Sequence, residues 1–499
     1  MEEPEFERAR CDIGLSAACE QATWYSLMNV IALCLGSGAG IPFEEEELRG
    51  ILDWTGIGWS DLRLASPLPL KAVFRSGDPL LMRDFDQCDL GTWRWSPDTF
   101  DRTLVPQAQG WTVIAEIECA KWLGFAGHSE ATAGEPCAWW RALGTLLWAT
   151  ARGQLDFAWK NMRDDRGLFV AATDSATLKP TDPSNDLADQ ACMLWACSDA
   201  ASLAGRDDSI YCDDNSRDEL SHCADALFQA IAEHKKDLLR ASSGKVRAES
   251  TTISALTWYA STTEARDLKA RCFWILRDLA DDLVKAQDAN EMVGNTIMDA
   301  AAALRALIEA FRVTRLRTYA ECAAKIFAFI ESQWSARDGV YSETPMASEI
   351  TYNADDIGVI LGALNASRLF LRDGIDRETA GERMLVFFHR AVNYAGLQMS
   401  MPGASFLPGW FREHEPVTHF RHDSIPLPPQ AGGRFGTAPV LAGELGYDPH
   451  MQVWSRRMIF DAPAAMRAVC EMLWMNSEAI PGFPEAKPEH PPTEIERRV

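Results

Sequence analysis

Apolar residues recur at every third or fourth position over most of the chain between residues 107 and 397, and polar segments separate these stretches. This spacing places apolar side chains on one face of a helix. Few runs between these stretches alternate as strands do, so the pattern predicts an all-α protein. We expect helices at 107–124, 137–161, 186–204, 216–240, 250–260, 263–287, 295–313, 316–335, 354–371 and 376–397, with others at 22–35, 43–54 and 461–475.

Several of the predicted helices begin in the same way. The segments that start at Asp189, Asp299 and Asp355 each have a carboxylate near the helix start, small residues after it and a large aliphatic residue five positions on. A helix around Thr252 falls in the gap between the first two, and one around Trp140 lies one interval earlier. A recurrence of about 50 residues, with two helices in each unit, is typical of stacked helical hairpins.

The predicted helices also alternate in polarity. Those at 263–287 and 316–335 carry many charges, as solvent-facing helices do, whereas those at 295–313 and 354–371 begin almost uncharged, as inner helices do. Inner and outer helices that alternate at this interval favour a closed ring. Over roughly residues 107–400 the pattern resembles the six-hairpin glycosidase-like (α/α) toroids, in which inner helices surround a central cavity. The resemblance implies a toroid of six or seven hairpins.

Two segments interrupt the helical pattern, at about 55–105 and 400–460. Both are rich in turn residues and in aromatic residues, so we expect them to fold over one end of the ring. Residues 1–480 are then a single toroid domain with two loop insertions, and the proline-rich segment 481–499 is an extended tail.

Charge narrows the choice of partners. The chain of 499 residues has 48 Lys and Arg against 72 Asp and Glu, a net charge of −24. Such a balance argues against nucleic acid and anionic membranes as partners. The apolar run Trp24–Leu35 is too short to span a bilayer. The 13 cysteines include no CxxC pair, and most lie among apolar residues, which favours free thiols and a cytoplasmic location. The sequence leaves open which oligomeric state the protein has and whether an N-terminal leader has been removed.

The carboxylates near the helix starts form the first candidate site. In a closed ring they would point toward one mouth of the cavity, and cleavage of a glycosidic bond needs two carboxylates, one of them kept protonated. The loop before Asp355 adds further polar groups, and a glycine-rich turn brings an arginine toward the cavity. The predicted catalytic residues are Asp355, Asp356, Glu349, Asp189 and Asp299, and the predicted substrate-binding residues are Tyr352, Asn353, Trp410, Arg434 and Trp95.

With the resemblance, these residues predict a carbohydrate-active enzyme that is hydrolase-, lyase- or epimerase-like. It would act on a small-molecule or oligosaccharide substrate without a cofactor. A simpler interpretation is that such residues cap helices, a role that suits Asp186, Asn295 and Asn353.

Two other functions remain open. His414, His419 and His422, with Asp423 beside them, could bind zinc or copper, although an exposed histidine cluster would have the same sequence. The ring could also be a non-catalytic scaffold, which would show an exposed apolar patch and a cavity plugged by side chains.

Overall fold

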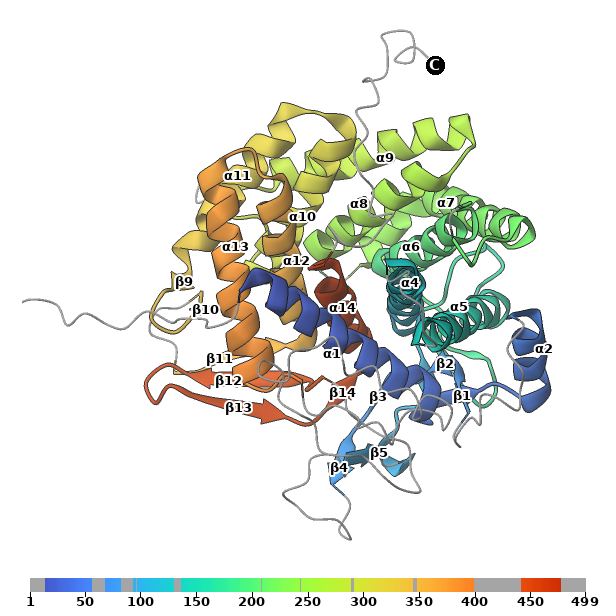
Figure 1. Ribbon diagram of the computed structural model, residues 1–499. Coiled ribbons are helices and arrows are strands. Elements are labelled where there is room, and N and C mark those ends of the chain that lie inside the picture. The colour runs from blue at the N-terminus through green and yellow to red at the C-terminus, as the bar shows by residue number, and fades with distance from the viewer. Residues whose placement is uncertain are drawn as a thin grey trace, which may run out of the picture.

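The computed structural model describes residues 14–55, 68–81, 93–95, 97–129, 136–207, 209–242, 244–288, 291–343, 348–398 and 441–476. Helices dominate these ranges, and the strands are short (Figure 1).

Six helices form a closed inner ring in which each packs against the next and the last returns to the first (Figure 1). They are α4 (Pro106–Ser129), α6 (Leu187–Ala204), α8 (Lys245–Thr262), α10 (Ile297–Thr314), α12 (Ala354–Phe370) and α14 (Ala462–Trp474). A helix with neighbours on every side has to be apolar or small nearly all round. In α6, for example, only Ala188 and Ser202 are not buried.

Six further helices lie outside the ring, and each packs mainly on one inner helix. They are α5 (Pro136–Asn161), α7 (Asp214–Ala241), α9 (Arg266–Lys285), α11 (Arg317–Ser332), α13 (Gly374–Phe388) and α1 (Leu15–Gly36). The first five follow their inner partner in the chain. The sixth hairpin instead joins the two ends of the described chain, because α1 packs on α14, and Ser26 Oγ donates a hydrogen bond to the carbonyl of Val469 at 3.1 Å. A shorter helix, α2 (Glu45–Thr55), packs on α5.

Close approach of the inner helices depends on glycine at two positions. A Cβ at Gly358 in α12 would lie 2.8 Å from the Cα of Ala468 in α14, and one at Gly110 in α4 would lie 2.5 Å from Cys192 Sγ in α6. A larger residue at either position would push two ring helices apart.

The strands form six small antiparallel sheets: β1–β2, β3–β14, β4–β5, β6–β7–β8, β9–β10 and β11–β12–β13. In the order β1 to β14, the strands span Gly40–Pro42, Leu70–Val73, Ser76–Gly77, Pro79–Leu81, Trp93–Trp95, Thr103–Leu104, Ala172–Asp174, Pro180–Asp182, Trp334–Ser335, Val340–Tyr341, Ile350–Asn353, Glu444–Asp448, Val453–Arg457 and Phe460–Asp461. Single turns of 3-10 helix (Pro97–Thr99) and π-helix (His389–Tyr394) complete the elements.

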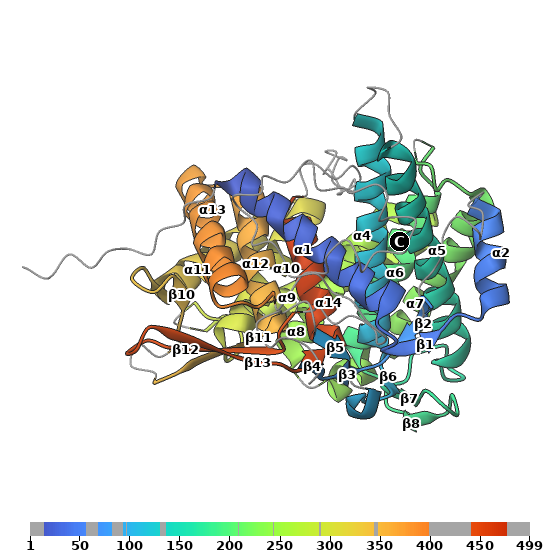
Figure 2. The ribbon, with the colours of Figure 1, turned by 60° about the horizontal axis from the view of Figure 1, so that its bottom comes forward.

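Most of these strands lie at one end of the ring, along the bottom of Figure 2. It is the end where the inner helices begin, because β6, β8, β11 and β14 lead directly into α4, α6, α12 and α14. The described parts of 55–105 and 400–460 belong to this end, as predicted, although residues 444–457 are a β-hairpin and not a loop.

The all-α toroid predicted from the sequence is confirmed, and it has six hairpins. Two details were wrong. The segment around Trp140 belongs to the outer helix α5, and the inner helix of that hairpin is α4. Thr296, not Asn295, caps α10, since its side chain accepts a hydrogen bond from the Asp299 N–H.

Candidate functional site

Three aspartates from two neighbouring inner helices converge on one arginine at the N-terminal end of the ring. Arg247, in the first turn of α8, places Nη1 2.9 Å from Asp355 Oδ2 and Nη2 2.9 Å from Asp356 Oδ1 in α12. Its Nε lies 3.4 Å from Asp299 Oδ1 in α10. All of these side chains are partly buried, and the carboxylates are at most 20% exposed.

A second arginine approaches from the opposite side. Arg467 of α14 places Nη1 3.1 Å from Asp355 Oδ1, so that each oxygen of Asp355 faces a different arginine. We call Arg247, Asp299, Asp355, Asp356 and Arg467 the mouth cluster. Its three carboxylates and two guanidinium groups leave one net negative charge.

The helix starts hold these side chains in place. Asn353 and Asp356 form a capping box, in which Asn353 Oδ1 accepts from the Asp356 N–H at 2.7 Å and Asp356 Oδ2 accepts from the Asn353 N–H at 3.1 Å. Asp356 is therefore both part of a cap and a partner of Arg247. The capping interpretation and the site interpretation of this residue are compatible.

Burial and charge act against each other in the mouth cluster. Burial alone would lower the pKa of Arg247, but the attraction of Asp355 and Asp356 outweighs it, and the pKa is raised. The pKa of Asp356 is also raised, because loss of hydration outweighs the pull of Arg247. Asp356 therefore takes up a proton more readily than a free aspartate.

Asp189 stands at the same end of the ring, in the first turn of α6, and is 6% exposed. Gln107 of α4 donates a hydrogen bond to its Oδ1 at 2.9 Å. Burial raises the pKa of Asp189 to about 7, because this one hydrogen bond does not replace the lost water. Burial and then the charge of Asp189 raise the pKa of the Cys192 thiol, while Arg467 lowers it, so Cys192 lies within electrostatic reach of both. Near neutral pH, Asp189 can hold or release a proton.

Of the other predicted site residues, Asn353 contacts this group through its capping hydrogen bonds with Asp356. Tyr352 is buried in β11, where its hydroxyl donates to the carbonyl of Tyr341 and its ring packs edge-on to Phe387 at 5.7 Å. Asn353 is the exposed cap described above. Glu349 is exposed beside Gly446 of β12, away from the mouth cluster. Trp95 lies in β5, paired with Pro79 of β4. Outside the described residues lie Trp410, Arg434, His414, His419, His422 and Asp423.

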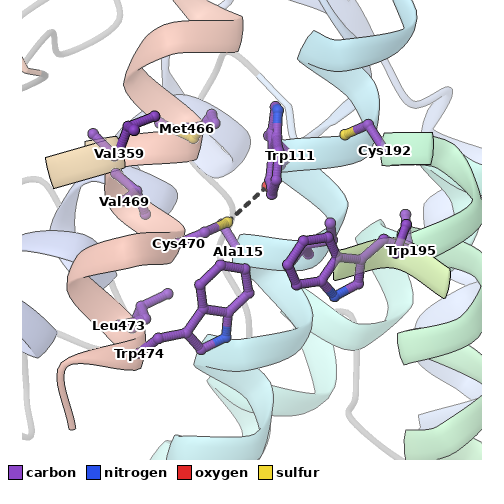
Figure 3. Packing of buried hydrophobic residues seen from close by; sticks show 14 of the residues in the cluster. Trp111, Ala115, Cys192, Trp195, Val359, Met466, Val469, Cys470, Leu473 and Trp474 are labelled. Carbon is purple, nitrogen blue, oxygen red and sulfur yellow. Dashed lines mark hydrogen bonds between the residues drawn. The ribbon is translucent and has the colours of Figure 1, made fainter. Parts of the chain in front are cut away.

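Aromatic side chains fill the interior of the ring. Trp195 of α6 and Trp474 of α14 stack with their centroids 5.0 Å apart and an angle of 7° between the planes. Trp111 of α4 packs edge-on to Trp195 at 5.6 Å (Figure 3). Cys470 beside them donates through Sγ to the Trp111 carbonyl at 3.4 Å (Figure 3). These indoles occupy the space that an open toroid would leave for a substrate.

A buried charge cluster completes the filling. The Arg305 guanidinium lies 4.9 Å from the ring centre of Trp474, and it forms ion pairs with Glu471 and, at 2.9 Å, with Glu309. A cavity lined by residues of all six inner helices has a volume of ≈ 10 Å³ for the centre of a water molecule, and a second one beside Arg305 and Glu309 is equally small. Sites for small organic molecules are typically about 300–1,000 Å³. The expectation of an open central cavity is therefore wrong for the described part of the ring.

Sequence reasoning missed Gln107, Arg247 and Arg467, which hold the carboxylates. Each belongs to an early turn of an inner helix. These residues could have been found from one sequence feature, the recurrence of polar residues near the starts of otherwise apolar helices. Arg247 was missed because the predicted helix began at residue 250, five residues after the observed start.

A separate groove of ≈ 560 Å³ lies outside the ring, between α5 and α7. None of the predicted site residues lines it. Its lining residues are Glu47, Gly50, Ala149, Arg152, Gly153, Leu155, Asp156, Trp159, Lys160, Cys197, Glu219, Leu220 and Cys223.

Comparison with known proteins places the architecture. A D-mannose isomerase aligns over 96% of this chain and 99% of its own, with a TM-score of 0.51 and 11% sequence identity. The chain therefore has the fold of an (α/α) toroid with six helical hairpins in its described part. A sugar epimerase from a ruminal bacterium aligns over 87% of this chain and 97% of its own (TM-score 0.48, 13% identity), and an unsaturated glucuronyl hydrolase specific for heparin over 92% and 97% (TM-score 0.46, 11% identity). No family model and no curated protein matches the sequence.

Two further features of the structure concern metal binding and membrane-spanning helices. The described residues contain no group of three or more His, Cys, Asp or Glu side chains arranged to hold a metal ion. Within the same ranges, the toroid has no helix with the length and apolarity needed to cross a membrane.

Proposed function

We propose that the toroid is a carbohydrate-active enzyme whose site is the ring mouth formed by the mouth cluster and Asp189. The observation that carries the proposal is the convergence of Asp299, Asp355 and Asp356 on Arg247 at the end where Asp189 retains a proton near neutrality. Acid–base chemistry at a glycosidic or anomeric carbon needs carboxyl groups in both states of protonation.

The two kinds of carboxyl group suit different roles. Asp189, with a pKa of about 7, is the proton donor and acceptor of the proposed site. Asp355, held by an arginine at each oxygen, is the ionised group that stabilises positive charge in the transition state. Asp299 and Asp356 keep further oxygens near the mouth for hydrogen bonds to sugar hydroxyl groups.

The charge of the site favours a neutral substrate. Both arginines are already paired with aspartates, and the mouth cluster retains a net negative charge. An acidic sugar would have to displace one of these carboxylates, whereas a neutral sugar only adds hydrogen bonds. Because the ring interior is filled, the sugar enters and leaves by the mouth.

A panel of neutral mono- and disaccharides, read by NMR for hydrolysis, epimerisation and aldose–ketose isomerisation, tests the proposal. Asp189→Asn and Asp355→Asn should abolish turnover of any sugar that reacts. Asp282→Asn is the matched control, since Asp282 is ion-paired with Lys285 at 3.1 Å on the outer helix α9. Folding of each variant is checked by thermal unfolding. Full turnover in both mouth variants would contradict the proposal.

A non-catalytic binding scaffold is the second candidate, and the filled ring interior favours it. A scaffold needs a rigid body and no substrate cavity. It predicts that the folded protein neither turns over nor binds any sugar of the panel, and a single reproducible turnover would exclude it.

A further inference from the structure

Three residues that line one small cavity inside the ring each have a buried polar atom with no hydrogen-bond partner in the protein. These atoms are Ser250 Oγ of α8, Trp195 Nε1 of α6 and Arg467 Nε of α14. Ser250 is 3% and Trp195 1% exposed, so bulk water does not reach them. A buried polar atom without a hydrogen-bond partner destabilises the folded protein, because it has lost its hydration and gained nothing in return. Three around one cavity indicate a ligand that satisfies them together.

The volume of the cavity fits one small molecule. It amounts to ≈ 10 Å³ for the centre of a water molecule, and a cavity needs about 10–15 Å³ by that measure to hold one water. Residues of all six inner helices line it, including the ion-paired side chains Arg305 and Glu471. The cavity therefore lies in the ring interior, beneath the mouth.

We propose that this cavity is a binding site for a single structural water molecule, held by Trp195, Ser250 and Arg467. The indole N–H of Trp195 and the Nε–H of Arg467 donate to the water oxygen. The water donates one hydrogen to Ser250 Oγ and directs the other toward the carboxylate of Glu471. Two donated and two accepted hydrogen bonds are the full capacity of a water molecule.

The charges around the cavity select water over an anion. Arg305 is ion-paired with both Glu309 and Glu471, so this buried group has one net negative charge. A halide ion would add to that charge and would lose two hydrogen bonds, since it has no hydrogen to give to Ser250 or Glu471. Water adds no charge and satisfies all four groups.

The water connects the ring interior with the mouth cluster. Arg467 binds the water through Nε and Asp355 through Nη1, at 3.1 Å from Asp355 Oδ1. The water thereby fixes the plane of the Arg467 guanidinium, which in turn orients one oxygen of Asp355. This inference rests on the geometry of the cavity and does not depend on the proposed enzymatic function.

Crystallography and NMR of the full-length protein test the site. A high-resolution crystal structure of the wild type should show one density peak within hydrogen-bond distance of the three atoms. In protein with ¹⁵N-labelled tryptophan, the Trp195 indole N–H should show a cross-peak to long-lived water, assigned by its loss in Trp195→Phe. No density in the wild-type cavity, with no cross-peak, would overturn the proposal.

Two variants on the same helix separate this water from other buried hydroxyl groups. Ser250→Val fills the cavity with methyl groups and should abolish the Trp195 cross-peak. Thr252→Val is the control, because the Thr252 hydroxyl already donates to the Ala248 carbonyl at 2.7 Å, and it should keep the cross-peak. A cross-peak that survives Ser250→Val in a folded protein contradicts the assignment, and so does an anomalous bromide peak in wild-type crystals soaked in bromide. If Ser250→Val does not fold, the wild-type density and cross-peak decide alone.

Discussion

Asp189→Asn should stabilise the protein increasingly as the pH rises. A carboxyl group whose pKa is about 7 in the folded chain and about 3.9 in the unfolded chain binds more protons when folded, between those two pH values. The free energy of unfolding therefore falls across that window as the pH rises. Asparagine has no charge to desolvate and can keep the hydrogen bond from Gln107.

The size of the effect follows from the same two pKa values. At 1.36 kcal/mol for each pH unit, the charged form of Asp189 costs about 1.5 kcal/mol at pH 5 and about 4 kcal/mol at pH 8. The gain from Asp189→Asn should therefore be about 2.5 kcal/mol larger at pH 8 than at pH 5. The difference between the two pH values is the quantity to measure, because contributions of the amide that do not depend on pH cancel.

Denaturant unfolding of wild type and variant at pH 5, 6, 7 and 8 measures this difference. Asp186→Asn is the control, because Asp186 caps the same helix by accepting from the Ala188 N–H at 2.7 Å, and asparagine caps equally well. Its change in stability should vary with pH far less than that of Asp189→Asn, because the Asp186 charge is only a minor cause of the raised pKa of Asp189. A gain for Asp189→Asn that is constant from pH 5 to pH 8 would refute the claim that burial holds a proton on Asp189.

Three further predictions concern packing and charge. Arg305→Met should destabilise the protein by about 3–5 kcal/mol in denaturant unfolding, because it leaves Glu309 and Glu471 buried without their cation, and R305M/E471L should lose less than R305M alone. Gly110→Ala should cost about 1–3 kcal/mol through contact with Cys192 Sγ, and Cys192→Ala should relieve part of that cost in a double-mutant cycle; strict additivity would show that the contact does not matter. Arg247→Met should cost about 1–3 kcal/mol at pH 7 and less at pH 4, because the raised pKa of Asp356 lets this carboxylate take up a proton as the pH falls; an equal loss at both values would exclude an electrostatic origin.

The helices and their closure into a ring could be predicted because most inner helices are apolar or small nearly all round, whereas each charged outer helix has one apolar stripe. In α9, for instance, Leu268, Cys272 and Leu276 are buried at intervals of four residues. The same rule misled at Trp140, because the first half of the outer helix α5 is as apolar as an inner helix. Local pattern does not distinguish a buried outer helix from a ring helix.

The candidate site was predictable only in part. Carboxylates at equivalent positions of ring helices have to share one end, and Asp189, Asp299 and Asp355 do so. Their arginine partners could not be assigned, because Arg247 and Arg467 come from helices more than 100 residues away from at least one partner, and a lone arginine in a helix reads as a surface residue. The sequence also does not predict that the ring interior is filled. Trp195 and Trp474 could either line a cavity or close it, and side-chain packing across the ring decides between the two.

The sixth hairpin has a consequence for biosynthesis. Because the other five hairpins lie between α1 and α14 in the described chain, α1 waits for its partner until all five have been synthesised. Until then α4 and α12 also lack the neighbour that separates them, and apolar surfaces of three helices stay uncovered. Closure of the ring is therefore a late step of folding, because it requires α14. A nascent chain that stalls before residue 462 lacks this helix and cannot close the ring.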